Sequence, residues 1–310
     1  MITPLFSAQQ LRRLTIDELK GILRLKLGRM VRRVGTINPG NRVFRGVKWD
    51  ERPNQISKLS YPPGDYARLG RLNRDGQPVF YASCAGPGVF YELRAEPGCR
   101  VAFSTWRVTE PLWMHDLGFH PDVLHRLGTS AVGARAWMAQ PIPNETARNR
   151  RLRKQVSEAF AADVPPDAEY LYKQSTALAE FWIDHEEDYP LYLDGPVIPH
   201  AAGVVYPSLQ MRGDADNVAF LPRFVHSSLQ LEQIQFVLVE RADPRRFAYT
   251  FLTEAISSHF VDGTTIVWRD ELPAEKLRRG HIALENGRWV QRDDAGTIYA
   301  IRPPSVDALR

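Results

Sequence analysis

The stretch of sequence that decides the fold lies between Asn41 and Val108, and its main pieces are Val43-Phe44-Arg45-Gly46, Gly70-Arg71-Leu72-Asn73 and Val79-Phe80-Tyr81-Ala82-Ser83. Short apolar runs bounded by turn residues are typical of buried strands, so we predict strands over 42–49 and 78–83. A helical segment after the second strand carries Glu92. Two fixed arginines, one aromatic ring and one carboxylate suit a ligand that is anionic at one end and flat at the other.

On the N-terminal side of this stretch, residues 7–34 have helical periodicity. Thr15 and Glu18 have the spacing of a capping box, in which each side chain satisfies a free N–H of the first helical turn. Gly35 is the expected C-cap. We therefore predict one N-terminal helix that ends just before Gly35.

On the C-terminal side, the pattern predicts a short helix over 89–95 and a strand over 99–108. From 110 to 185 we predict mostly helices, over 129–139, from the N-cap Asn144 to about 161, and over 168–183. We then expect strands at 235–240 and 247–252. Asn286-Gly287 between two apolar runs is a strong hairpin signal, and a further turn at 294–296 precedes a last strand.

The composition limits the possible functions. The 310 residues are 44% hydrophobic and 25% charged, with a formal net charge of +4. This charge suits anionic ligands but is too small and too dispersed to indicate nucleic acid by itself. The basic cluster at 148–154 fits either a nucleic-acid stripe or a solvated helix face, and we favour the solvated face. No apolar run reaches the length of a membrane span, and the N-terminus lacks a signal-peptide pattern, so we expect a cytoplasmic protein without membrane contacts.

Several well-known sites are missing from the sequence. It contains no phosphate-binding Gly-x-x-x-x-Gly-Lys-Ser/Thr loop, no Gly-x-Gly-x-x-Gly and no Gly-x-Ser-x-Gly. His115, His120 and His125 are spaced five apart, which does not place them on one face of a helix, so we expect no metal site. Glu92 lies among Val89-Phe90-Tyr91 and Leu93, where a carboxylate needs a partner.

The pattern resembles the RES domain family, named for an arginine, a glutamate and a serine. The early strand ends in Arg45, as in that family. The segment from Gly70 to Tyr81 matches the family pattern Gly-x-Arg-Trp-Asn-x-x-Gly-x-Pro-x-x-Tyr, and Glu92 follows on a helix. Ser208 stands in the Tyr206-Pro207-Ser208 context, with Asn217 downstream. The resemblance covers about residues 40–225.

The chain departs from the family pattern at three positions. Gly46 stands where a tyrosine often follows the first arginine, Leu72 replaces the usual tryptophan, and Leu69 replaces a glycine. Family members are also shorter. We accordingly divide the chain into an N-terminal helical extension (1–39), a RES-like NAD-binding catalytic domain (40–225) with a helical insertion at about 110–185, and a C-terminal β-rich extension (226–310), which we expect to pack on the same domain.

The resemblance implies an α+β fold with a split β-sheet core like that of ADP-ribosyltransferase toxins. It implies a toxin-like enzyme that cleaves the nicotinamide–ribose bond of NAD⁺, by phosphorolysis or hydrolysis. NAD⁺ is then a substrate, inorganic phosphate a possible co-substrate, and no cofactor is needed. A helix-turn-helix antitoxin is the implied partner, and a homo-oligomer is possible.

The resemblance also assigns roles to individual residues. Arg45, Glu92 and Ser208 become the catalytic residues, and Arg71, Tyr81 and Asn217 bind NAD⁺. Glu92 suits the stabilisation of an oxocarbenium-like transition state, and the arginines suit diphosphate oxygens. No His or Lys base stands beside Ser208 in the sequence, so we do not expect a covalent serine intermediate. Two alternatives stay open, namely an ADP-ribosyltransferase that modifies a macromolecule and a non-catalytic module that binds nucleic acid or protein.

Overall fold

The computed structural model describes residues 4–28, 30, 33–128, 142, 145–165, 167–184, 200–243, 246–269, 279–285, 288–293 and 295–300. Its helices are α1 (Ala8–Arg13), α2 (Ile16–Leu27), α3 (Gly88–Glu92), α4 (Pro121–Leu127), α6 (Ala147–Phe160), α7 (Tyr172–Asp184) and α8 (Pro222–Ser228). Short 3₁₀ turns occur at Ile56–Leu59, Gly64–Tyr66 and Glu169–Leu171. Within these ranges, no helix has the length and apolar character needed to cross a membrane.

The strands form one mixed sheet in which nearly all neighbours are antiparallel. They are β1 (Val34–Ile37), β2 (Arg42–Lys48), β3 (Phe80–Ser83), β4 (Arg100–Val108), β5 (Leu112–Asp116), β6 (Gly203–Pro207), β7 (Asp216–Phe220), β8 (Leu229–Asp243), β9 (Ala248–Val261), β10 (Thr265–Arg269), β11 (Arg279–Glu285), β12 (Arg288–Asp293) and β13 (Ile298–Ala300). The order across the sheet is β1-β5-β6-β7-β3-β2-β4-β8-β9-β11-β12-β13, with β10 paired to β9. Only β5 and β6 run parallel among the described pairs. The predicted α+β class is confirmed.

The sheet is nearly divided between β2 and β3. These two strands share a single register pair, Phe44 with Ser83, whereas β2 and β4 are paired along their whole length. We call this junction the β2–β3 seam. It separates a half made of β1, β5, β6, β7 and β3 from a half made of β2, β4, β8 and β9. The seam is where β2 brings Arg45 close to β3.

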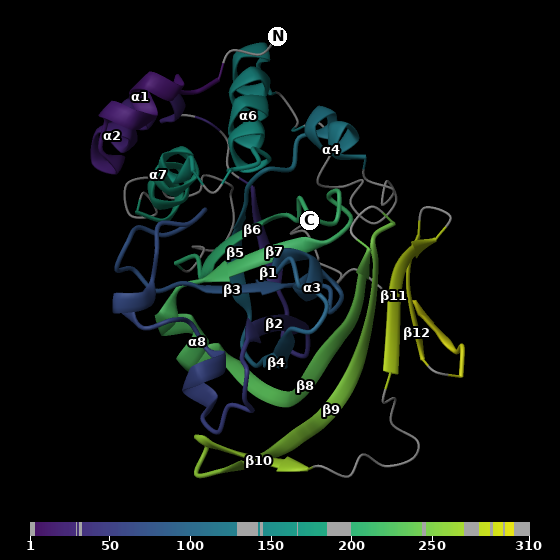
Figure 1. Ribbon diagram of the computed structural model, residues 1–310. Helices are drawn as coiled ribbons and strands as arrows, with labels where there is room; N and C mark the ends of the chain where they lie inside the picture. The colour runs from purple at the N-terminus through teal and green to yellow at the C-terminus, as the bar shows by residue number, and fades with distance from the viewer. Residues whose placement is uncertain are drawn as a thin grey trace.

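Helices cover the two halves differently. Figure 1 shows α1, α2, α6 and α7 grouped beside the β5–β6–β7 half, while β8 and β9 curve around α3. Leu19 and Leu23 of α2 are completely buried in the first group, against α7 and the sheet. Burying a leucine side chain contributes roughly 1.5–3 kcal/mol. Around α3, its residues Val89, Phe90 and Tyr91 pack on β9, β11 and β12.

The N-terminal prediction was right about its cap and wrong about its length. Thr15 and Glu18 form the expected capping box, which confirms the start of α2. A second capping box at Ser7 starts α1, and the extended backbone of Thr15 separates the two helices. Gly35 is not a C-cap: it lies inside β1 and is paired with Met114 of β5. Pairing with β5 therefore overrides the helical periodicity that extends to residue 34.

The central prediction missed a strand. Residues 112–116 form β5, which lies between β1 and β6. The helix predicted over 129–139 and the N-cap Asn144 lie outside the described residues. Thr146 caps α6, because its hydroxyl accepts the backbone N–H of Asn149.

The C-terminal strands were predicted at the correct places, but their lengths were underestimated. β8 and β9 extend well beyond the predicted 235–240 and 247–252. β11 and β12 pair antiparallel up to Glu285 and Arg288, so the hairpin is confirmed although residues 286 and 287 are outside the described ranges. β12 then pairs with β13 after the expected turn. β8 pairs with β4 along its length, which joins the C-terminal strands to the central sheet.

Candidate active site

Two adjoining cavities, of about 430 Å³ and about 240 Å³, share four lining residues: Tyr81, Glu92, Tyr206 and Asn217. The larger cavity is also lined by Arg71, Arg94 and Tyr172. The smaller one lies at the β2–β3 seam, where Phe44, Arg45 and Ser83 line it. Ligand pockets of small molecules typically enclose about 300–1,000 Å³. Together the two cavities form a cleft of suitable size, with Glu92 on the shared wall.

The carboxylate of Glu92 is held in place by Ser208. Ser208 is completely buried, and its hydroxyl donates to Glu92 Oε1 over 2.5 Å while it accepts the backbone N–H of Met211. The other carboxylate oxygen of Glu92 makes no hydrogen bond to the described residues, and the side chain is exposed. Ser208 is thus the hydrogen-bond partner of Glu92, although Glu92 itself is exposed and only its apolar neighbours are buried. The buried hydroxyl orients the acid and does not itself face the cleft.

The chain forces α3 to present Glu92 in this direction. Val89, Phe90 and Tyr91 are buried, which leaves Glu92 as the exposed side chain at the end of the helix. Gly88 lets α3 approach β3, because a Cβ atom there would lie 2.4 Å from Ser83 Oγ. A contact that short means that a side chain at position 88 would force Ser83 or the helix to shift.

Asn217 contributes an unsatisfied acceptor to the cleft. The residue is only 4% exposed, and its Oδ1 atom has no hydrogen-bond partner in the described part of the chain. A buried acceptor without a donor costs about 1–3 kcal/mol. A ligand that donates a hydrogen bond to this oxygen would offset that cost. Neighbouring Tyr206 keeps its proton, because burial, followed by the nearby Tyr81 and Glu92, raises the pKa of its hydroxyl.

Tyr81 supports the loop that carries Arg71. Its hydroxyl donates to Asn73 Oδ1 over 2.8 Å and accepts the backbone N–H of Leu72 over 2.9 Å. Gly70 is required in this turn, since a Cβ atom would lie 2.6 Å from Asn73 Oδ1. Burial raises the pKa of the Tyr81 hydroxyl, so it remains a neutral hydrogen-bonding group. Only the ring of Tyr81 remains to contact a ligand.

Arg71 places a positive charge on the wall of the larger cavity. Its guanidinium donates to the carbonyl oxygens of Phe160 and Ala162 and lies 5.7 Å from the centroid of the Tyr172 ring. Carbonyl partners fix the orientation of a guanidinium but leave its charge unneutralised. Arg94 also lines this cavity, and it forms a 3.6 Å ion pair with Asp163. Arg71 is therefore the better placed of the two to bind an anion.

Arg45 spans the seam. Its Nε donates to the carbonyls of Leu59 and Ser60 at 3.1 Å, and its Nη1 donates to the carbonyl of Tyr81 across the seam at 2.6 Å. The guanidinium also lies 5.2 Å from the centroid of the Phe80 ring. Burial lowers the pKa of Arg45 to about 10, so the side chain is still charged at neutral pH. These contacts join β2, β3 and the segment between them that contains Leu59 and Ser60, which makes Arg45 part of the frame of the smaller cavity.

The departures from the expected pattern have local explanations. At position 46 a Cβ atom would lie 2.3 Å from Val89 Cγ1, so no side chain fits between β2 and α3. Leu72 is buried in the cluster that joins α2, α7 and the sheet. The sequence also gave no reason to select Tyr172, Arg94 or Asp163. Tyr206 could have been found, since it directly precedes Pro207-Ser208 and lies opposite Asn217 in the β6–β7 register.

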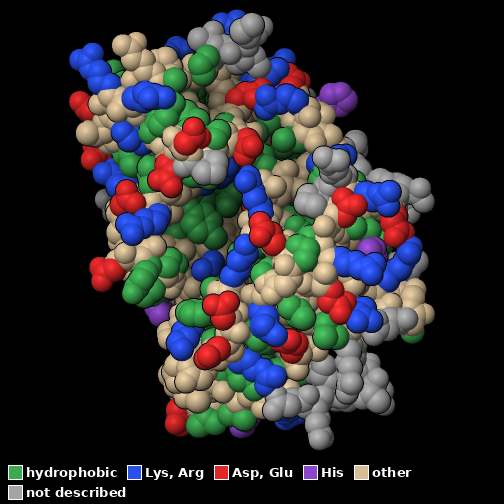
Figure 2. All heavy atoms as spheres, viewed as in Figure 1, with side chains coloured by type: hydrophobic (Ala, Val, Ile, Leu, Met, Phe, Trp, Pro, Cys, Tyr) green, Lys and Arg blue, Asp and Glu red, His purple; other side chains and the backbone are tan. Residues whose placement is uncertain are grey.

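The basic cluster of α6 is largely paired. Arg150 and Arg153 form ion pairs with Glu145, and Lys154 pairs with Asp122. Figure 2 shows Lys and Arg side chains intermixed with Asp and Glu over the visible face. This arrangement favours a solvated, ion-paired helix face over a nucleic-acid stripe.

The fold and the cleft define an α+β protein with a carboxylate and arginines around one ligand-sized site. The family model described as RES domain matches residues 41–239, and the chain belongs to the RES domain family. This family is generally linked to NAD-related activity. No curated protein and no solved structure matches the chain. The resemblance to the ADP-ribosyltransferase fold therefore stays a prediction.

Proposed function

We propose that the protein binds NAD⁺ in this cleft and cleaves the bond between nicotinamide and ribose. The observation that carries the proposal is the Glu92 carboxylate, fixed by buried Ser208 at the wall that both cavities share. Family membership supports the choice of NAD⁺ as the ligand. The cleft consists of a smaller and a larger cavity, which suits a substrate with a flat ring at one end and a diphosphate in the middle.

The reaction needs stabilisation of positive charge at the ribose. When the bond between the nicotinamide nitrogen and ribose C1′ breaks, its electron pair leaves with nicotinamide, which becomes neutral, and positive charge develops on the ribose. The free oxygen of Glu92 can stabilise that charge or accept a ribose hydroxyl. Ser208 keeps the other oxygen in place, so the carboxylate needs no reorientation during the reaction. Water or phosphate then forms the new bond to C1′.

The remaining residues suit binding. In this proposal Arg71 binds the diphosphate, and Tyr172 beside it offers a ring face to the adenosine half. Asn217 Oδ1 accepts a hydrogen bond from a ribose hydroxyl or from the nicotinamide carboxamide. The ring of Tyr81 flanks the bound ribose. Arg45 links β2 to β3 across the seam and adds positive charge to the smaller cavity.

The experiment is an incubation of the purified protein with NAD⁺, with and without inorganic phosphate, in which free nicotinamide and the ribose product are measured. Release of nicotinamide supports the proposal, and the product identifies water or phosphate as the acceptor. Glu92→Gln is the control, because its exposed side chain can change without loss of packing. Absence of nicotinamide release by folded protein under both conditions would overturn the proposal. NAD⁺ labelled on the ADP-ribose part tests in parallel for transfer to a macromolecule.

A further inference from the structure

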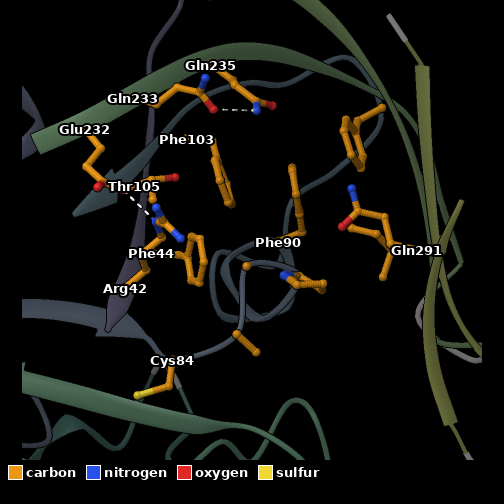
Figure 3. Close-up of a pocket in the computed structure, with 15 residues that line it drawn as sticks. Arg42, Phe44, Cys84, Phe90, Phe103, Thr105, Glu232, Gln233, Gln235 and Gln291 are labelled. Carbon is orange, nitrogen blue, oxygen red and sulfur yellow. Dashed lines mark hydrogen bonds and ion pairs between the residues drawn. The ribbon is translucent and has the colours of Figure 1, made fainter. Parts of the chain in front are cut away.

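A third cavity, of about 610 Å³, is lined by Gly86, Pro87 and Phe90 of the α3 segment but not by Glu92. It shares no residue with the larger cavity of the cleft and only Phe44 with the smaller one. Figure 3 shows side chains from β2, β4, β8 and β12 and from the α3 segment converging on it. The proposed cleavage of NAD⁺ makes no use of this space.

One wall of the third cavity is a series of stacked phenylalanine rings. Phe44 and Phe103 stack with centroids 5.8 Å apart, Phe103 and Phe90 with centroids 5.9 Å apart, and Phe90 and Phe251 with centroids 5.0 Å apart. Phe90 and Phe251 are buried, but Phe44 and Phe103 are only half-buried. The end of the series is therefore accessible to another flat ring. Offset stacking at centroid distances of about 4.5–7 Å is favourable beyond the burial of area.

The sheet face that carries Phe44 and Phe103 also carries polar side chains. Gln233 and Gln235 of β8 are paired with Thr105 and Phe103 of β4, and the Gln235 amide donates to the Gln233 amide over 3.4 Å. Gln291 of β12 also lines the cavity, and in Figure 3 the Phe90 ring lies between it and the two other glutamines. The two charged lining residues, Arg42 and Glu232, form a 2.6 Å ion pair, and Glu232 also pairs with Arg107 over 3.3 Å. Glutamine amides offer both donors and acceptors, the combination that pairs with the edge of a nucleobase. Stacking rings and neutral amides thus select a neutral, planar ring with donors and acceptors on its edge.

The third cavity also touches the element that carries Glu92. Gly86, Pro87 and Phe90 line it, and Glu92 lies two residues beyond Phe90 in a helix of five residues. Among the described residues, no side chain caps the N-terminus of this helix. A ligand that displaces Phe90 or Pro87 would therefore move Glu92 relative to Ser208.

We propose that this cavity is a second ligand site for a neutral planar heteroaromatic ring with an amide-like edge, such as a nucleobase or a pyridine carboxamide, and that its occupancy changes the position of Glu92 through α3. The binding part is independent of the proposed function. The coupling part rests on NAD⁺ cleavage at Glu92.

Binding is tested by calorimetric titration of the full chain with adenine as the probe. The double variant Gln233→Ala/Gln291→Ala removes the amides, and we expect adenine to bind about tenfold more weakly, as the loss of one or two hydrogen bonds predicts. Gly86→Ala is a second variant, since its new Cβ would lie 3.4 Å from Phe103 Cζ and narrow the space without a clash. Gln230→Ala, an exposed glutamine on the same strand, is the matched control and retains binding.

The cleft could also bind adenine, so Asn217→Ala is measured alongside. Binding that survives Asn217→Ala and is weakened by the glutamine and glycine variants supports the second site. Binding that is lost with Asn217→Ala and unaffected by the other variants overturns it, as does the absence of adenine binding at millimolar concentration.

Coupling is tested by the rate of nicotinamide release at saturating NAD⁺, where competition in the cleft no longer affects the rate. We expect adenine to change this rate by twofold or more, a change of about 0.4 kcal/mol in the barrier, in the wild type and not in the glutamine double variant. An unchanged rate in the wild type, with adenine bound, overturns the coupling. If no NAD⁺ cleavage occurs at all, the proposed function fails while the binding result still stands on its own.

Discussion

Ser208 and Glu92 meet through one hydrogen bond between residues from distant parts of the sequence. The serine lies after β6 and the glutamate ends α3, so their contact depends on the sheet register between β3, β7 and β6. Because Ser208 is completely buried, its hydroxyl can act on a substrate only through Glu92. This geometry makes Ser208 a positioning residue in the proposed reaction.

We predict that Ser208→Ala lowers kcat for nicotinamide release about tenfold, with little change in KM, because Glu92 remains present but loses its fixed orientation. The variant also leaves the Met211 N–H without an acceptor, which costs about 1–3 kcal/mol of stability. Steady-state kinetics and urea unfolding measure the two effects separately. A rise in KM at constant kcat would instead place the serine in substrate binding.

Asp116, at the end of β5, is a buried acid with a measurable effect. Both of its carboxylate oxygens are buried and have no hydrogen-bond partner among the described residues. Burial, followed by the charge of Asp216, raises the pKa of Asp116 from 3.8 to about 7, against an opposing effect of Arg33. The folded protein therefore keeps this proton at a pH where the unfolded chain has released it.

The resulting pH dependence has a definite sign. The contribution of Asp116 to stability is complete below pH 3.8 and is lost as the pH rises through about 7. We predict that Asp116→Asn, which stays neutral, removes this part of the decline in stability. The stability of the variant relative to the wild type should therefore be higher at pH 8 than at pH 5. Urea unfolding at both pH values measures the difference, with the exposed Asp65→Asn as the control. An identical pH dependence in wild type and Asp116→Asn would contradict the prediction.

At the scale of elements, α3 is the part of the fold most dependent on its neighbours. It has five residues and no side-chain cap, so packing holds it in place: β2 lies on one side, and β9, β11 and β12 lie on the other. An isolated helix of this length would not form in water. The position of Glu92 is therefore determined by contacts that α3 makes through Val89, Phe90 and Tyr91.

We predict that Gly46→Ala displaces α3, because the new Cβ would lie 2.3 Å from Val89 Cγ1 and 2.8 Å from Leu93 Cδ1. Stability should fall by about 1–3 kcal/mol, and nicotinamide release should fall with it. Gly21→Ala in α2 is the matched control. Nothing lies within 4 Å of its Cβ position, so this variant should gain up to about 1 kcal/mol. Full activity in Gly46→Ala would show that α3 tolerates movement.

The elements also show what could be predicted from the sequence. Local signals were reliable: the capping box at Thr15 is present, and the short helix predicted over 89–95 is found as α3, although it ends at Glu92. Pairing across the sheet was not available from local patterns, so β1 and β5 were missed and Gly35 was assigned to a helix end. The hydrogen-bond partners of the arginines could not be predicted from the sequence either. Nothing in the sequence near Arg45 indicates that its hydrogen bonds go to the carbonyls of Leu59, Ser60 and Tyr81.

At the scale of the whole molecule, the strands that follow the family match help to build the site. The match ends at residue 239, yet Trp289 of β12 packs edge-on against Tyr91 of α3 with ring centroids 5.0 Å apart. Its Nε1 donates to Asp214 in the loop between Ser208 and β7. One residue of the C-terminal hairpin thus supports both the helix of Glu92 and the loop of Ser208.

We predict that Trp289→Ala lowers the free energy of unfolding by about 3–5 kcal/mol and lowers kcat, since it removes a buried ring beneath α3. Trp289→Phe keeps ring packing and loses only the hydrogen bond, so its effects should be smaller. Trp49→Ala, at a partly exposed position directly after β2, is the control. Unchanged kcat in folded Trp289→Ala would mean that the C-terminal strands only stabilise the fold.

The β2–β3 seam is the place where the sheet should separate most easily under a pulling force. Tension across the strands is carried in series from neighbour to neighbour, and the seam offers one register pair where β4 and β8 share nine. A molecule bound in the smaller cavity touches Phe44 and Arg45 on one side and Tyr81 and Asn217 on the other, so it would link the two halves of the sheet. We expect bound NAD⁺ to raise the rupture force when single molecules are pulled between β1 and β12, and an unchanged force would place the ligand away from the seam.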